Sequence, residues 1–171
     1  RCDCIIAVGG GSAIDVAKCI KAYTDMEGDG ENGSWLKQPI KGNNIPFLAM
    51  PTTAGTGSEA TRYAVIYYDG AKQSVTSESF IPETVLMDPK VLITLPPYQK
   101  KATMCDALCH AIEAYWSVNS TEESKEYSRE AIKLVMENMD GYLANTENGR
   151  KNMLIAANTA GKAINITQTR S

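Results

Sequence analysis

Little in this sequence suits a membrane or a nucleic acid. No apolar run approaches the roughly 18 residues that a membrane-spanning helix requires, and the first residues show no signal-peptide pattern. The chain has 17 Lys and Arg against 20 Asp and Glu, a net charge of −3, so it lacks the basic surplus typical of nucleic-acid-binding domains. We therefore expect a cytoplasmic protein whose partners are neither membranes nor nucleic acids.

Cysteine and histidine are also sparse, and their spacing suits no structural cross-link. The five cysteines are an odd number and include no CxxC pair, which argues against a disulfide framework or a structural zinc knuckle. We predict reduced, buried thiols, with Cys105 and Cys109 packing inward from one helix. His110 is the only histidine in the chain.

The sequence does contain enough apolar residues, 43% of the total, for a packed core in one ordinary domain or two small ones. Residues 4–8 form a short apolar run beside glycines, which predicts a strand covered on both faces. A helix is predicted over 12–23, and its apolar stripe contains Ile14, Ala17, Ile20 and Ala22. Residues 25–44 are rich in glycine and polar residues and predict a loop.

The pattern changes from mixed to purely helical at Pro96-Pro97. Before it, strands are predicted over 45–50, 62–68 and 84–87, with Asp69-Gly70 as a hairpin turn. After it, helices are predicted over 98–116, 121–143 and 148–166, and Ser120-Thr121-Glu122-Glu123 supplies an N-cap and early acidic residues. We expect an α/β domain at 1–96 and an all-α domain at 97–171, in a sequence truncated at both ends.

A predicted strand, the turn Gly9-Gly10-Gly11-Ser12 and a predicted helix follow one another. This arrangement points backbone N–H groups and the positive end of a helix dipole at an anion. Glycine permits positive φ and lets a phosphate approach the backbone, and Asp15 and Lys18 are expected within reach of such a ligand. The turn matches neither GxGxxG nor GxxxxGK[ST], so a βα turn without a ligand is the alternative.

Two further segments have the composition of a binding site. Residues 51–59, PTTAGTGSE, directly follow a predicted strand, and ligands of open α/β sheets bind at such strand ends; a flexible linker is the alternative. Asp106 and His110 are spaced i, i+4, which places them on one face of a helix, as two ligands of one metal would be. A simple hydrogen bond between these two side chains is the alternative.

Taken in order, these segments resemble the iron-containing (group III) alcohol dehydrogenases. The matching motifs are GGGSAIDVAK at 9–18, PTTAGTGSE at 51–59, PETVLMDP at 82–89, DALCHAIEAY at 106–115 and AGKA at 160–163. The resemblance covers nearly the whole chain. It implies a Rossmann-like dinucleotide-binding half followed by an all-α domain, as in dehydroquinate synthase-like proteins.

The resemblance also implies roles for individual residues in binding NAD or NADP. The pyrophosphate would contact Gly9, Gly10, Gly11 and Ser12, with Asp15 nearby. The adenine and phosphate side of the cleft would include Thr52, Thr53 and Thr56. Lys72 is similar to the family lysine that contacts the nicotinamide ribose.

Asp106 and His110 resemble the first two ligands of the family's catalytic metal, with Fe²⁺ expected first and Zn²⁺ or Mn²⁺ as alternatives. The family site has one Asp and three His, and its last two histidines follow the AGxA segment. This sequence contains no second histidine. We therefore expect weak metal binding and little or no turnover from this chain alone, because a complete site needs at least three protein ligands.

The implied activity is the interconversion of a primary alcohol and an aldehyde with NAD(P) and a divalent metal, by an enzyme that forms homo-oligomers when complete. One alternative is a different reaction on the same fold, such as that of a polyol or phosphonoacetaldehyde-type reductase or of a dehydroquinate synthase-like lyase. The other is a catalytically inactive truncated domain that retains only nucleotide binding.

Overall fold

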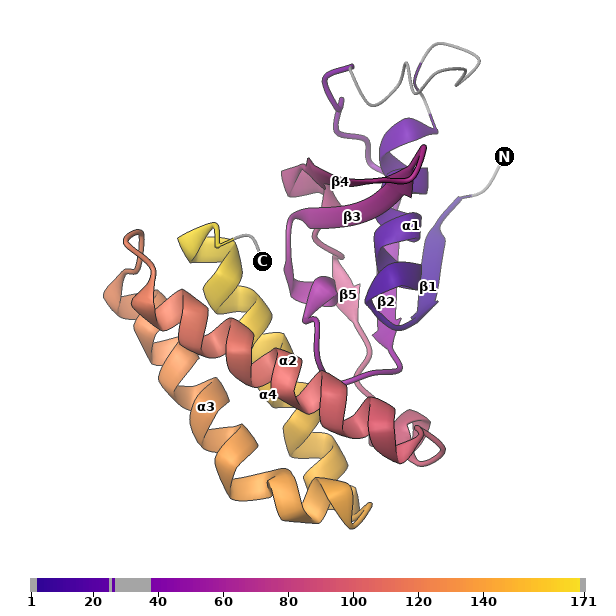
Figure 1. Cartoon of the computed structure of the whole chain (residues 1–171). Helices are drawn as coiled ribbons and strands as arrows, with labels where there is room; N and C mark the ends of the chain where they lie inside the picture. The colour runs from indigo at the N-terminus through magenta and orange to yellow at the C-terminus, as the bar shows by residue number, and fades with distance from the viewer. Residues whose placement is uncertain (1–2, 25, 27–37, 170–171) are drawn as a thin grey trace.

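The computed structural model describes residues 3–24, 26 and 38–169. Its first part contains β1 (Ile5–Gly9), α1 (Gly11–Tyr23), β2 (Phe47–Pro51), β3 (Tyr63–Tyr68), β4 (Ala71–Thr76) and β5 (Thr84–Val85), with short 3₁₀ helices at Ser58–Ala60, Glu78–Phe80 and Pro89–Leu92. The second part consists of α2 (Pro97–Trp116), α3 (Glu122–Leu143) and α4 (Glu147–Thr167). Figure 1 shows the three long helices packed together on one side of the α/β part.

Three parallel strands form a small sheet in the order β1-β2-β5. Helix α1 covers one face of it, and the packed side chains are those of Ala7, Ile14, Ala17, Phe47 and Ala49. On the other face of β1, Ile6 and Val8 are 63% and 58% exposed. The predicted coverage of this strand on both faces is therefore wrong for the described residues, because no described element packs on that side.

Strands β3 and β4 form an antiparallel hairpin. The predicted turn at Asp69-Gly70 is confirmed: both residues have positive φ, 50° and 72°, as a two-residue hairpin turn that follows the strand twist requires. One face of the hairpin packs Ala64, Ile66 and Val75 toward α1. Because side chains alternate along a strand, the opposite face is free to line a cleft.

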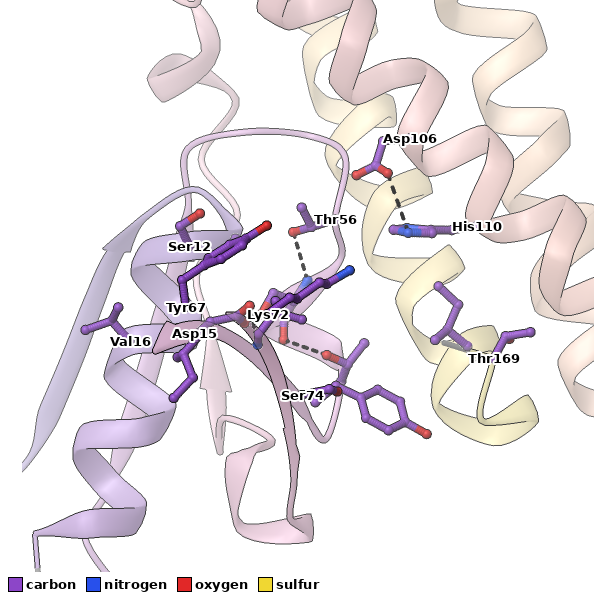
Figure 2. Close-up of a pocket in the computed structure, with 17 residues that line it drawn as sticks. Ser12, Asp15, Val16, Thr56, Tyr67, Lys72, Ser74, Asp106, His110 and Thr169 are labelled. Atoms are coloured by element: carbon purple, nitrogen blue, oxygen red, sulfur yellow. Dashed lines mark hydrogen bonds and ion pairs between the residues drawn. The ribbon is translucent and has the colours of Figure 1, made fainter. Parts of the chain in front are cut away.

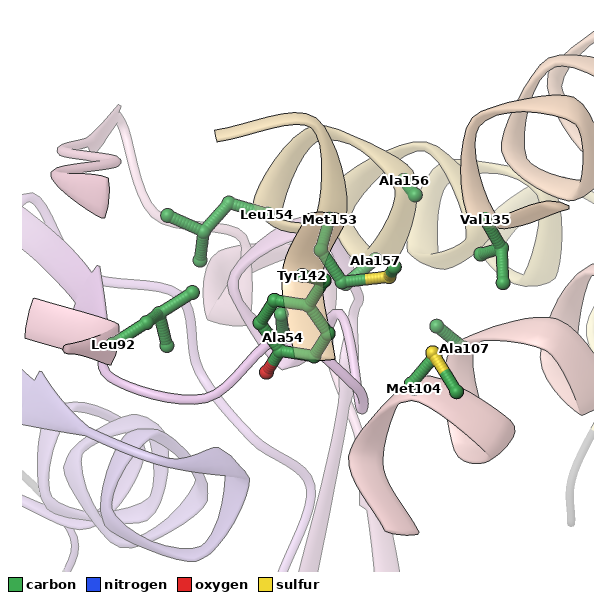
Figure 3. Packing of buried hydrophobic residues seen from close by; sticks show 10 residues of the cluster. All are labelled: Ala54, Leu92, Met104, Ala107, Val135, Tyr142, Met153, Leu154, Ala156 and Ala157. Carbon is green, nitrogen blue, oxygen red and sulfur yellow. The ribbon is translucent and has the colours of Figure 1, made fainter. Parts of the chain in front are cut away.

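The three helices begin and end within one residue of the positions that the sequence pattern predicted. Thr121 caps α3 through a capping box with Ser124, and Thr146 caps α4 by accepting a hydrogen bond from the N–H of Gly149. The core between the helices (Figure 3) contains Ala54, Leu92, Met104, Ala107, Val135, Tyr142, Met153, Leu154, Ala156 and Ala157. Many of these residues are alanines, which allow the helices to approach closely.

Helix α1 departs from its predicted apolar stripe. Ile20, expected in that stripe, is 55% exposed, whereas Lys18 and Lys21 are buried. Both lysines have oxygen partners on other elements, which compensate for the removal of their charges from water. The buried side of α1 is therefore set by these partners as well as by hydrophobic periodicity.

The prediction of buried thiols holds only for Cys19, because Cys4, Cys105 and Cys109 are exposed; Cys2 lies outside the described residues. Helix α2 instead buries Thr103, Ala107, Ala111 and Ala114. Most of the predicted loop 25–44 also lies outside the described residues. Within the described part of the chain, no helix is both long and apolar enough to cross a bilayer.

Candidate active site

The glycine turn connects β1 to α1, with Gly10 as the N-cap of the helix. Gly10 has a φ of −77°, and the positive-φ glycines among the described residues are Gly57 and Gly70. The turn therefore does not use the positive φ that glycine permits. The turn needs glycine because it has no room for side chains.

The second loop, residues 51–59, lies directly against this turn. The N–H of Thr52 donates to the carbonyl of Gly9 over 2.9 Å. A Cβ placed on Gly11 would lie 2.8 Å from the side chain of Thr56, closer than real Cβ contacts. The structure thus brings the two predicted loops together at the carboxyl ends of β1 and β2.

The same loop packs against the helical part through two further glycines. Gly57 has a φ of 59°, and a Cβ on it would lie 2.5 Å from the carbonyl oxygen of Ala157 in α4. A Cβ on Gly161 would lie 2.5 Å from the carbonyl oxygen of Gly57, and one on Gly55 would lie 2.7 Å from Thr103 of α2. These close approaches fix the α/β part against the helices.

Asp15 points toward the second loop and the hairpin. Its Oδ1 accepts a 2.6 Å hydrogen bond from the hydroxyl of Ser58, and its Oδ2 accepts one of 3.0 Å from the N–H of Val65. Both oxygens are thus already used inside the protein, although Asp15 lines the cleft. The expectation that Lys18 lies within reach of a ligand is wrong, because its side chain is fully buried and is not part of the cleft.

Asp106 and His110 lie close together on α2, as their spacing predicts. The Nε2 of His110 is 3.5 Å from the Oδ1 of Asp106, and their side chains are 12% and 40% exposed. The Nδ1 of His110 is buried without a hydrogen-bond partner among the described residues. No third His, Cys, Asp or Glu of the described chain joins them in a cluster suited to a metal. The pair therefore supplies two side chains that could coordinate a metal ion.

One cleft of about 620 Å³ connects the glycine turn to this pair. Figure 2 shows Ser12 on one side, Asp106 and His110 on the other, and Lys72 of β4 between them. Of the predicted site residues, the cleft is lined by Gly11, Ser12, Asp15, Thr56, Lys72, Asp106 and His110. Gly9, Gly10, Thr52 and Thr53 are outside this lining, and the two pairs contact each other, Thr52 with Gly9 and Thr53 with Gly10.

Sequence reasoning did not predict that one face of the β3–β4 hairpin lines the cleft; of this face it named only Lys72. In the antiparallel register Tyr67 pairs with Lys72 and Val65 with Ser74, and all four side chains line the cleft. Tyr67 is 76% exposed there. The signal was present in the sequence, because alternation on both sides of Asp69-Gly70 defines which residues share a face.

The described residues place one cation, Lys72, in the lining of the cleft. Arg62, next to the lining residues Thr61 and Tyr63 in the chain, is not part of this lining. Its guanidinium donates to the side-chain and backbone oxygens of Asn165 over 3.1 and 2.7 Å and forms an ion pair with Glu78. Arg62 therefore fastens β3 to α4.

Comparison with known proteins identifies the family of this chain. Residues 1–89 match the family of iron-containing alcohol dehydrogenases, and residues 100–170 match the C-terminal part of the Fe-containing alcohol dehydrogenase family. The chain belongs to the iron-containing alcohol dehydrogenase family. The predicted fold, a Rossmann-like half followed by a helical part, is thereby confirmed.

Three relatives illustrate the family. The NAD-dependent methanol dehydrogenase of Bacillus methanolicus is 36% identical over 96% of this chain and 44% of its own length. The phosphonoacetaldehyde reductase of Streptomyces viridochromogenes is 32% identical over 100% of this chain and 46% of its own. The structure of sulfoacetaldehyde reductase from Bifidobacterium kashiwanohense in complex with NAD⁺ has a TM-score of 0.88 and 31% identity, over 97% of this chain and 45% of that one. This chain thus spans less than half the length of these relatives.

Proposed function

We propose that this chain is part of an enzyme that interconverts a primary alcohol and an aldehyde, using NAD or NADP and a divalent metal. One observation carries the proposal: a single cleft contains both the turn suited to a dinucleotide and the carboxylate–imidazole pair suited to a metal. Membership of the iron-containing alcohol dehydrogenases supports it. We further propose that 1–96 and 97–171 are two domains that each supply one wall of the cleft.

In this proposal the pyrophosphate lies at the start of α1. The first backbone N–H groups of a helix have no acceptor within the helix and favour an anion. Gly11 and Ser12 supply such groups to the cleft, and Thr56 adds a hydroxyl beside them. Lys72 lines the cleft between the turn and α2 (Figure 2), and in this proposal it would contact the nicotinamide ribose.

Asp106 and His110 would hold the metal. A carboxylate and an imidazole suit Fe²⁺, Zn²⁺ or Mn²⁺, and the 3.5 Å between Oδ1 and Nε2 lets both atoms contact one cation. When bound, the metal supplies Lewis acidity at the substrate oxygen, and the dinucleotide accepts or supplies the hydride. In this proposal the chain's own residues would bind and orient both groups within one cleft.

The substrate is proposed to be an uncharged alcohol or aldehyde. Lys72 is the one cation among the described lining residues, and the proposal uses it for the cofactor. Reduction of an anionic aldehyde, as the names of two relatives state for them, is the second candidate. It requires Lys72 to bind the substrate's anionic group instead.

The experiment compares NADH binding by Gly11→Ala and by the unchanged chain, using NADH fluorescence. A methyl group on Gly11 displaces Thr56 and occupies the space beside the first N–H groups, so we expect affinity to fall at least about tenfold. Gly42→Ala is the control, because its new Cβ meets only Ser79 at an ordinary 3.9 Å. Equal affinity in all three proteins would refute this placement of the pyrophosphate.

A further inference from the structure

Lys18 is a fully buried cation that the proposed reaction does not use. It lies in the middle of α1 with 0% exposure. Its Nζ is within hydrogen-bond distance of four oxygens: the carbonyl and hydroxyl of Ser58 at 2.7 and 2.9 Å, the hydroxyl of Thr61 at 3.2 Å and the carbonyl of Tyr63 at 2.6 Å. All four belong to the segment that leads from the second loop into β3. An ammonium group has three hydrogens, so this one segment can satisfy all of them, and Asp15 on α1 adds an ion pair, with its Oδ1 3.7 Å from the Nζ.

We infer that Lys18 is a positioning residue that fixes residues 56–63 against α1 and thereby holds the loop wall of the dinucleotide cleft in place. The inference rests on the proposed function for the identity of the ligand. It does not rest on it for the position of the loop, which can be measured without a ligand.

The connection from Lys18 to the cleft runs through Ser58. The N–H of Ser58 donates to the hydroxyl of Thr56 over 3.2 Å, and Thr56 packs directly on Gly11. The hydroxyl of Ser58 also donates to Asp15. Two residues of α1, Lys18 and Asp15, therefore bind this loop. Movement of Ser58 would therefore move Thr56 relative to the first N–H groups of the helix.

A second connection runs from Lys18 toward the helical part. Glu59 is 3% exposed and accepts a 3.2 Å hydrogen bond from the side-chain amide of Asn158 in α4. Burial raises the pKa of Glu59, while Asn158 and the charge of Lys18 oppose that rise. Glu59 directly follows Ser58 in the chain, so the segment that Lys18 binds also contacts α4 through Glu59, next to the Gly57–Gly161 approach.

The same helix contains a matched control. Lys21 is also buried, at 2% exposure, and its Nζ donates to Glu83 over 2.9 Å. It has no role in the cleft lining. Lys18→Met and Lys21→Met therefore each remove one buried ammonium from α1, and only the first removes bonds to the loop.

The test measures hydrogen exchange by mass spectrometry and NADH binding for the whole 171-residue chain and both variants. In Lys18→Met we expect amides of residues 56–65 to exchange about tenfold to a hundredfold faster, because buried oxygens lose a charged donor. NADH affinity should fall about tenfold in the same variant. In Lys21→Met neither quantity should change by more than about twofold. Equal loop exchange in the two variants would overturn the inference.

If Lys18→Met does not fold, Thr61→Val removes one of the four acceptors while keeping the side-chain shape. Severalfold faster exchange at 56–65 would support the inference, and unchanged exchange would overturn it. The two hypotheses fail differently: absence of NADH binding by the unchanged chain refutes the proposed function, whereas unchanged loop exchange in the variants refutes the role of Lys18.

Discussion

The two walls of the cleft are held in place by different interactions. The wall formed by the glycine turn and the second loop depends on a few polar contacts, chiefly those of Asp15 and Lys18, and on glycines that leave no space for a Cβ. The wall formed by α2 depends on distributed apolar packing, in which Ala107 and Ala111 are completely buried. A single substitution in the first wall should therefore act locally, whereas one in the second should act on the stability of the whole helical part.

In the proposed function the two walls would have different tasks. The loop wall would fit a large, flexible dinucleotide, and hydrogen bonds suit this task because they fix direction as well as distance. The α2 wall would hold two metal-binding atoms, those of Asp106 and His110, at a fixed separation, which a helix packed by alanines does by its geometry. The close contact of Gly57 with Gly161 then fixes the distance between the walls.

The largest expected effect in the helical wall is that of Leu154→Ala. Leu154 is 2% exposed in the core of Figure 3, and such truncations cost about 2–5 kcal/mol of unfolding free energy. Urea denaturation should show this loss, with exchange rising throughout α2–α4 rather than in the loop alone. Leu143→Ala, at a position that is 38% exposed, is the control and should cost far less. A Leu154→Ala variant that loosened only residues 56–65 would contradict the proposed division of the walls.

A smaller effect, specific to the loop wall, is expected from pH. Burial lowers the pKa of Lys18 from 10.5 to about 8, although Asp15 and Glu59 act to raise it. The folded state therefore disfavours the charged amine below pH 8, and this cost disappears as the pH rises from 8 to 10.5. Relative to Lys18→Met, the unchanged chain should gain up to about 3 kcal/mol of stability across that window.

The free energy of unfolding has to be compared between the unchanged chain and Lys18→Met at each pH. The reason is that Cys19, next to Lys18, changes this free energy with pH in the opposite direction. Burial raises its pKa from 9.0 to about 11, so its contribution to stability is complete below pH 9 and is lost as the pH rises through 11. Subtraction of the Lys18→Met curve cancels most of this contribution. A flat difference curve between pH 8 and 10.5 would show that folding does not lower the pKa of Lys18.

Sequence patterns predicted the elements better than the contacts between them. Hydrophobic periodicity predicted the bounds of α2, α3 and α4 to within one residue. The i, i+4 spacing correctly predicted that Asp106 lies beside His110. Periodicity failed on α1, where Lys18 and Lys21 are buried because of partners 40 to 62 residues away in the chain. A pattern within one helix has no information about such partners. The same limit explains why Cys105 was expected to be buried and is exposed.

The smallest expected effect concerns the metal, for which the described α2 wall supplies only two donors. We expect the chain to bind Mn²⁺ weakly and Asp106→Asn to weaken it further, by about tenfold, as measured from the free-ion EPR signal. Mn²⁺ is the probe because it prefers oxygen and nitrogen ligands, so the exposed thiols of α2 contribute little. Glu113→Gln makes the same charge change at another position on α2 and should have little effect. Sub-micromolar binding that survives Asp106→Asn would place the cation elsewhere, and the helix geometry would then fix only a hydrogen bond between Asp106 and His110.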